Sequence, residues 1–212
     1  NNKEMPIFNR AHILTELGLL EEWFINKYLN IQLKKSEHKI FQTAFSFLCE
    51  ILLDQTQTFA HMDYHSRNII ALPDQKLGII DYQDARLAPY TYDLASILRD
   101  CYVQWPLEKV NNWLNYFYTR STIAKKYSKS EFIQAFELCG LQRHLKVLGI
   151  FARLYIRDQK SGYLANMPLV FNYILRCLKC YNELQDFNEI IQEKIYPIFK
   201  YENSNDPSRR AR

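Results

Sequence analysis

The sequence predicts a mainly helical fold that contains one small β-hairpin. Three observations support this prediction. Apolar residues make up 48% of the 212-residue chain, glycine and proline number only 5 and 7, and apolar residues recur at helical spacing over most of its length. A chain of this length and apolar content can bury a sizeable core. We therefore expect a helical segment, a small hairpin and then a helical bundle, in that order along the chain.

Several segments have the apolar spacing of amphipathic helices. They are residues 18–31, 41–53, 94–102, 110–118, 130–139, 143–156 and 169–184. Pro106 follows soon after the third of these and would stop it, because proline cannot continue a helix. Gly140 and Gly162 are expected to form turns between later helices.

Two short apolar runs, residues 69–72 and 77–80, stand on either side of the turn signal Pro73-Asp74-Gln75-Lys76. Short apolar runs that flank a turn signal are typical of a β-hairpin. We expect this hairpin to be the only sheet in the chain.

The charge balance and the length of the apolar runs argue against a nucleic-acid partner and a membrane partner. The net charge is +4, from 27 Lys and Arg against 23 Asp and Glu, which is too small a surplus for a nucleic-acid footprint. No apolar run approaches the ~18 residues of a membrane-spanning helix, so we expect no membrane partner.

The polar tail 203–212 is expected to be disordered and solvated rather than a nucleic-acid arm. The cluster Arg143, His144 and Lys146 is interpreted as a solvated helix face rather than an anion site.

Five cysteines, an odd number, and the lack of a secretory signal favour reduced thiols in a cytosol. Cys177 and Cys180 form a C-x-x-C, but there is no second pair and no His at ligand spacing. Both are therefore expected to be buried as small apolar residues.

The stretch from His61 to Asn68 has the pattern H-x-D-x-x-x-x-N, the spacing of a kinase catalytic loop. Phosphoryl transfer requires an aimed nucleophile and neutralised phosphate charge. Asp63 can accept the proton of an attacking hydroxyl, and the amide oxygen of Asn68 can reach a Mg²⁺ ion on the phosphates.

A second element follows: the apolar residues 77–80 end in the carboxylate of Asp81. Hard oxygen ligands of this kind suit Mg²⁺. Because the strands of a hairpin are antiparallel, Asn68 and Asp81 would meet at adjacent strand ends. The alternative for Asp63, Asn68 and Asp81 is a turn rich in Asx residues with a helix cap.

The segments HMDYHSRNII and GIIDYQDARLAPYTYDLASILRDCYVQWP resemble the aminoglycoside phosphotransferase and choline kinase superfamily. Within it they are most similar to the bacterial anomeric kinases of N-acetylmuramate and N-acetylglucosamine, as is GLQRHLKVLGIFARL further along. The resemblance implies the C-terminal lobe of a protein-kinase-like fold. It also implies a cytoplasmic enzyme that uses ATP and Mg²⁺ to phosphorylate a sugar in peptidoglycan recycling.

By position, the resemblance implies that Asp63 is the catalytic base and that Asn68 and Asp81 are Mg²⁺ ligands. Asp93 matches the superfamily's helix-start Asp that steadies the catalytic loop. Its alternative, together with Thr91, is a favourable helix N-terminus.

The remaining site candidates each have a simpler alternative. His61 is expected to support the loop by bonding to nearby backbone. His65 and Arg67 are candidates for phosphate or sugar binding, or else solvated loop residues. Asp84 and Arg86 are candidates to border the substrate pocket, or else a surface ion pair.

Three positions depart from the superfamily pattern. Met62 stands where relatives have Gly or Arg, Tyr82-Gln83 replaces a Phe-Gly type of turn, and Ala88 stands where Gly is common. Only Ala88 raises a question about local structure, since a loop that needs a positive φ would exclude it.

The glycines at 18, 78, 140, 149 and 162 cannot form a G-x-G-x-x-G loop. We therefore expect residues 1–202 to be the C-terminal catalytic lobe, with the N-terminal nucleotide lobe absent and the chain inactive alone. A separately encoded or missing N-terminal lobe would then be a partner. The rival interpretations are an aminoglycoside phosphotransferase, although the helical half shows no acidic surplus, and a truncated, non-catalytic remnant of a kinase.

Overall fold

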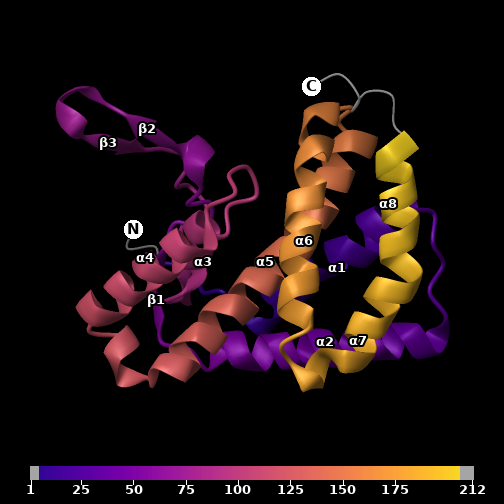
Figure 1. Cartoon of the computed structure of the whole chain (residues 1–212), viewed down its shortest axis with the longest axis horizontal. Helices are drawn as coiled ribbons and strands as arrows, with labels where there is room; N and C mark the ends of the chain where they lie inside the picture. Colours follow the sequence, from indigo (N-terminus) through magenta and orange to yellow (C-terminus); the bar gives the residue numbers. More distant parts are fainter. Residues whose placement is uncertain (1–4, 206–212) are drawn as a thin grey trace. The chain divides into compact units, whose positions relative to one another are not determined.

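The structure of the chain is a computed structural model that describes residues 5–205, and it is mainly helical (Figure 1). The α-helices are α1 (Arg10–Leu19), α2 (Lys35–Leu53), α3 (Tyr92–Leu98), α4 (Leu107–Arg120), α5 (Lys129–Ile156), α6 (Met167–Leu178), α7 (Gln185–Ile190) and α8 (Tyr196–Asn205). Two π-helical segments are η1 (Leu20–Tyr28) and η7 (Ile191–Ile195). Short 3₁₀ turns are η2 (Ser66–Asn68), η3 (Pro73–Gln75), η4 (Ala124–Lys126), η5 (Ser161–Asn166) and η6 (Asn182–Leu184). The strands are β1 (Gln57–Ala60), β2 (Ile69–Ala71), β3 (Leu77–Ile79) and β4 (Arg86–Pro89).

The predicted hairpin is confirmed. Strands β2 and β3 pair antiparallel, with Ile69 opposite Ile79 and Ala71 opposite Leu77, and the turn η3 joins them. In Figure 1 the hairpin extends as a narrow arm away from α3 and α4.

The prediction of a single sheet is wrong, because β1 pairs antiparallel with β4 in a second one. Gln57 lies opposite Pro89 and Ala60 opposite Arg86, and a parallel bridge joins Ile7 to Leu87 on the other side of β4. The short strand QTFA has no clear alternation of apolar and polar residues, and its partner lies far along the chain. Local pattern therefore carried no sign of this pairing.

The predicted turn at Gly140 is also wrong, because α5 runs unbroken through it from Lys129 to Ile156. A glycine inside a helix costs roughly 1 kcal/mol relative to alanine. The flanking Cys139 and Leu141 are buried, and burial of such neighbours offsets a cost of this size.

Other helix boundaries differ from the prediction. The first helix begins earlier, at Arg10, and continues as the π-helix η1. Helix α3 ends at Leu98 rather than at residue 102, and α6 ends at Leu178 rather than at residue 184. Helix α8 continues to Asn205 and so includes the first three residues of the expected tail, and residues 206–212 lie outside the described residues.

The chain forms two compact units, each built from two separate stretches of sequence. The first unit consists of residues up to Ile13 together with Cys49–Arg143. Its core contains Phe8, Tyr92, Phe132 and Phe136, all fully buried. The rings of Phe8 and Tyr92 meet edge to face, with centroids 5.2 Å apart. This unit contains every site residue predicted from the sequence.

The second unit consists of Leu14–Leu48 and the residues from His144 onward. Helices α6 and α8 run side by side in it (Figure 1), where Phe171 stacks on Phe199 with ring centroids 4.8 Å apart. A buried ion pair joins Lys146 to Glu16 at 2.5 Å, and His144 is buried as well. The expectation that His144 and Lys146 lie on a solvated helix face is therefore wrong.

None of the five cysteines forms a disulfide in the described part of the chain. Cys177 is buried as expected, but Cys180 is exposed, because it follows the end of α6. Within residues 5–205, none of the helices has the length and apolar character needed to cross a membrane.

Candidate active site

The H-x-D-x-x-x-x-N stretch lies in the first unit, between β1 and β2. Strand β1 ends at Ala60, the chain then makes an irregular loop, and the turn η2 carries Asn68 to the start of β2. Asp81 follows β3 directly. The two short sheets thus place the three predicted chemical groups on connected loops.

Asp93, in the first turn of α3, holds the start of this loop. One carboxylate oxygen accepts the backbone N–H of His61 at 2.6 Å, and the other accepts that of Met62 at 3.1 Å. Burial raises the pKa of Asp93, and these two hydrogen bonds act in the opposite direction. The geometry is that expected of a residue that steadies the loop.

His61 connects the loop to the chain just before Asp81. Its Nδ1 accepts the Asp63 N–H at 3.3 Å, so the proton lies on Nε2, which donates to the Ile80 carbonyl at 2.9 Å. The imidazole is buried. His61 therefore makes the backbone contacts expected of a loop-supporting residue.

Asn68 and Asp81 meet at the open end of the hairpin. The Ile80 N–H donates to the Asn68 carbonyl at 3.1 Å and extends the β2–β3 ladder. The side-chain amide of Asn68 donates to the Asp63 carbonyl at 3.0 Å and, over a longer 3.4 Å, to an Asp81 carboxylate oxygen. The antiparallel hairpin thus brings Asn68 next to Asp81, and the Asn68 side chain also contacts the backbone of Asp63.

This donor set fits a magnesium ion that is also held by phosphate. The amide nitrogen of Asn68 donates to the Asp63 carbonyl and to the Asp81 carboxylate, so only the amide oxygen of Asn68 could serve as a metal ligand. Within residues 5–205 there is no cluster of three or more His, Cys, Asp or Glu that could hold a metal by itself. Mg²⁺ commonly binds through one or two side chains and completes its shell with water and substrate phosphates.

Two residues of the site adopt left-handed backbone conformations, one in the loop between β1 and β2 and one directly after β3. Met62 has φ 76° and Asp81 has φ 69°. Aspartate tolerates this region better than most residues, whereas methionine does so only when its surroundings hold it there. Ala88 lies in β4 opposite Thr58, so its departure from the superfamily pattern creates no such demand.

His65 and Arg67 both pack against Tyr102. The Arg67 guanidinium lies 3.7 Å from the centroid of the Tyr102 ring, and the His65 ring meets it edge on at 5.1 Å. Nδ1 of His65 is buried and has no hydrogen-bond partner among the described residues. Burial lowers the pKa of His65, and the charge of Arg143 adds to this effect. His65 is thus partly buried in the loop, while Arg67 is exposed.

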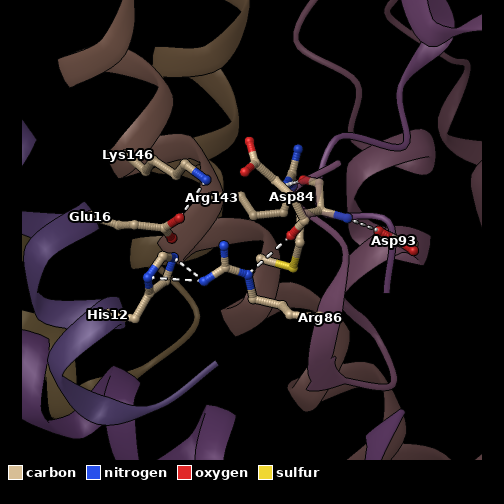
Figure 2. Close-up of polar contacts among 8 residues, drawn as sticks. His12, Glu16, Asp84, Arg86, Asp93, Arg143 and Lys146 are labelled. Carbon is tan, nitrogen blue, oxygen red and sulfur yellow. Dashed lines mark hydrogen bonds and ion pairs between the residues drawn. The ribbon is translucent and has the colours of Figure 1, made fainter. Parts of the chain in front are cut away.

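Asp84 and Arg86 are not joined as the surface ion pair considered from the sequence. The Arg86 Nε donates to the backbone carbonyl of Asp84 at 3.1 Å, and its Nη1 contacts the ring nitrogens of His12 at 3.0 and 3.1 Å (Figure 2). Asp84 itself is exposed. None of these contacts links the two residues directly to Asp63.

Sequence reasoning missed two residues that hold the loop. Asp100 is fully buried, and its oxygens accept the N–H groups of Ser66 and Tyr102, each at 2.7 Å. Arg143 was expected to be solvated, but it is buried, and its Nη1 donates to the Met62 carbonyl at 2.9 Å (Figure 2). Neither residue stands at a recognisable spacing from the motif, so the sequence held no signal for its role.

The sequence pattern of the phosphotransferase enzyme family matches residues 5–123, which is more than half of the 212 residues. The chain belongs to this family.

Three curated relatives of this phosphotransferase are similar over most of its length, and each is named N-acetylmuramate/N-acetylglucosamine kinase. The protein of Neisseria meningitidis serogroup B is 35% identical over 194 residues, which cover 90% of this chain and 58% of the relative. That of Pseudomonas aeruginosa is 33% identical over 190 residues, or 88% of this chain and 56% of the relative. That of Pseudomonas putida is 33% identical over 192 residues, or 89% of this chain and 56% of the relative. The chain thus spans less than two thirds of the length of these relatives.

Proposed function

We propose that this phosphotransferase contributes the catalytic centre of an ATP-dependent kinase that phosphorylates the anomeric hydroxyl of N-acetylmuramate or N-acetylglucosamine. The observation that carries the proposal is that the Asn68 side chain, at the open end of the hairpin, contacts both the Asp63 backbone carbonyl and the Asp81 carboxylate. The shared name of the similar proteins supports the choice of sugar.

In the proposed reaction, the carboxylate of Asp63 accepts the proton of the sugar hydroxyl, while the oxygen of that hydroxyl bonds to the γ-phosphorus of ATP. The bond from this phosphorus to the bridging oxygen breaks, and ADP leaves. Such a transfer depends on alignment more than on covalent chemistry by the protein. The backbone contacts of the loop to Asp93 and Arg143 supply a fixed position for Asp63.

Asn68 and Asp81 would hold Mg²⁺ through their side-chain oxygens. The ion, when bound, neutralises charge on the phosphates. The contribution of the chain itself is to keep these two side chains adjacent, through the hairpin ladder and the His61 bridge to Ile80.

We further propose that residues 1–202 correspond to the C-terminal lobe of a kinase-like fold, and that the enzyme works in the cytoplasm in cell-wall recycling. The mainly helical structure and its small antiparallel sheets support the first part. The names of the similar proteins support a role in cell-wall recycling, since N-acetylmuramate is a sugar of the bacterial cell wall.

The test replaces the proposed base in the full-length protein. Asp63→Asn should lower kcat by about 10²-fold or more and leave nucleotide affinity nearly unchanged, because it removes only the proton acceptor. A coupled assay of ADP release, with N-acetylmuramate, N-acetylglucosamine and kanamycin offered separately, measures both rate and substrate. Asp54→Asn, at an exposed site outside the loop, is the matched control and should keep its activity.

Two results would contradict the proposal. An unchanged kcat in Asp63→Asn would remove this residue from the chemistry. Turnover of kanamycin without turnover of either sugar would replace the sugar kinase by an antibiotic phosphotransferase.

A further inference from the structure

We propose that Asp100 is a positioning residue that, through the backbone N–H of Ser66, sets the orientation of the turn that presents Asn68. Its effect on the reaction rate rests on the proposed function. Its effect on the order of the turn does not, and can be measured without any substrate.

The contact is direct and well shielded from water. Asp100 lies just after α3, its side chain is 0% exposed, and the bond from the Ser66 N–H is 2.7 Å long. The second oxygen is occupied at the same distance by the Tyr102 N–H, which fixes the carboxylate itself. Hydrogen bonds to a charged acceptor are shorter and roughly twice as strong as those between neutral groups.

Ser66, whose N–H is held by Asp100, begins the turn η2 that carries the proposed metal ligand Asn68. Ser66 is the first residue of η2 and Asn68 is the last, and the Asn68 N–H closes the turn on the His65 carbonyl at 3.0 Å. A displacement of the Ser66 end therefore tilts the whole turn. The side chain of Asn68 would then lose its alignment with Asp81.

Asp100 completes a set of backbone anchors on both sides of Asp63. Asp93 accepts the N–H groups of His61 and Met62, and Arg143 donates to the Met62 carbonyl. Asp100 holds the chain three residues beyond Asp63. Because backbone anchors precede and follow it, the loop is held at both ends and keeps little freedom to misalign the proposed base.

Ser66→Pro is the sharpest test, because it removes the N–H donor and leaves Asp100 in place. Proline is tolerated at the first position of a helical turn. The preceding His65 has the extended conformation (φ −129°, ψ 170°) that a residue before proline favours. Ser66→Ala is the matched control, since it keeps the N–H and removes only the hydroxyl.

In the full-length enzyme, we expect Ser66→Pro to lower kcat by about tenfold or more and to raise the Mg²⁺ concentration for half-maximal activity by a similar factor. Ser66→Ala should stay within about twofold of the unmodified protein. Asp100→Asn should follow Ser66→Pro in both measurements, because an amide nitrogen would then face one of the two N–H groups.

Amide hydrogen exchange without Mg²⁺, nucleotide or sugar gives the independent measurement. In the unmodified protein the Ser66 amide should be strongly protected, and in Ser66→Pro the Asn68 amide should exchange about tenfold faster than in Ser66→Ala. An unprotected Ser66 amide, or equal Asn68 exchange in the two variants, would overturn the proposal. So would a fall in thermal stability with no change in the Mg²⁺ requirement. If the unmodified protein phosphorylates no sugar, the proposed function fails, and the exchange data alone then decide the role of Asp100.

Discussion

At the scale of single residues, the surroundings of His65 in the loop between β1 and β2 disfavour protonation of its imidazole. Its ring packs against Tyr102, and the charges that act on it come from Arg143, Asp63 and Asp100. Burial lowers the pKa of His65 below its ordinary value of 6.5, and the Arg143 guanidinium lowers it further, while the two carboxylates act against this. The folded protein therefore favours the neutral imidazole.

This environment predicts a pH-dependent loss of stability. Because the pKa of His65 is lower in the folded state, the unfolded chain binds more protons as pH falls below about 6.5. The stability that the folded protein has with neutral His65 is fully present above that pH and is lost on acidification. In His65→Gln, the free energy of unfolding should fall less between about pH 7 and about pH 5 than in the unmodified chain. Urea denaturation at a series of pH values measures the free energy of unfolding. The same dependence of this free energy on pH in both proteins would contradict the prediction.

At the scale of elements, one glycine permits a close helix contact in the second unit. A Cβ atom on Gly149 of α5 would lie 2.4 Å from the carbonyl carbon of Leu19 and 2.5 Å from its oxygen. Both atoms belong to backbone and cannot move aside as a flexible side chain would. Helix α5 and the junction of α1 with η1 thus approach so closely that no larger residue fits.

We therefore expect Gly149→Ala to destabilise the protein by about 1–3 kcal/mol, the range found for overpacked cores. The control is Gly18→Ala in α1, where a Cβ would meet nothing within 4 Å. There the better helix propensity of alanine should stabilise the protein by up to about 1 kcal/mol. Thermal or urea denaturation of both variants measures the difference. A stabilised Gly149→Ala variant would show that the two elements can separate without cost.

At the scale of the whole molecule, each compact unit is assembled from stretches that are far apart in the sequence. In the first unit, the Phe8 N–H donates to the Leu87 carbonyl at 2.8 Å, and its ring packs against Tyr92. The N-terminal segment thereby covers the free edge of β4 and places a fully buried ring in the core.

Removing this ring should cost far more than removing its neighbour. Phe8→Ala should destabilise the protein by about 3–5 kcal/mol, as expected when a buried aromatic side chain is deleted. Ile7→Ala, at a residue that is 57% exposed, should change stability by less than about 1 kcal/mol. Urea denaturation followed by circular dichroism compares the two. Equal losses would show that Phe8 contributes no more to the core than a surface residue.

The sequence by itself determined the features that depend on neighbouring residues. Helical spacing of apolar residues predicted a mainly helical fold, and the Pro73–Lys76 turn signal predicted the β2–β3 hairpin. Because a hairpin has a defined register, the same pattern also brought Asn68 next to Asp81. These predictions hold because short-range spacing dictates which side chains share a face or a strand end.

Only the tertiary structure decided the contacts between distant segments. Strand β1 pairs with β4, which lies far along the chain. Gly140 stays helical inside α5, because the fold buries the residues on either side of it. Asp100 and Arg143 hold the loop between β1 and β2 through its backbone. A backbone N–H or carbonyl is the same at every non-proline residue, so the sequence of the loop cannot reveal which distant charge it will meet.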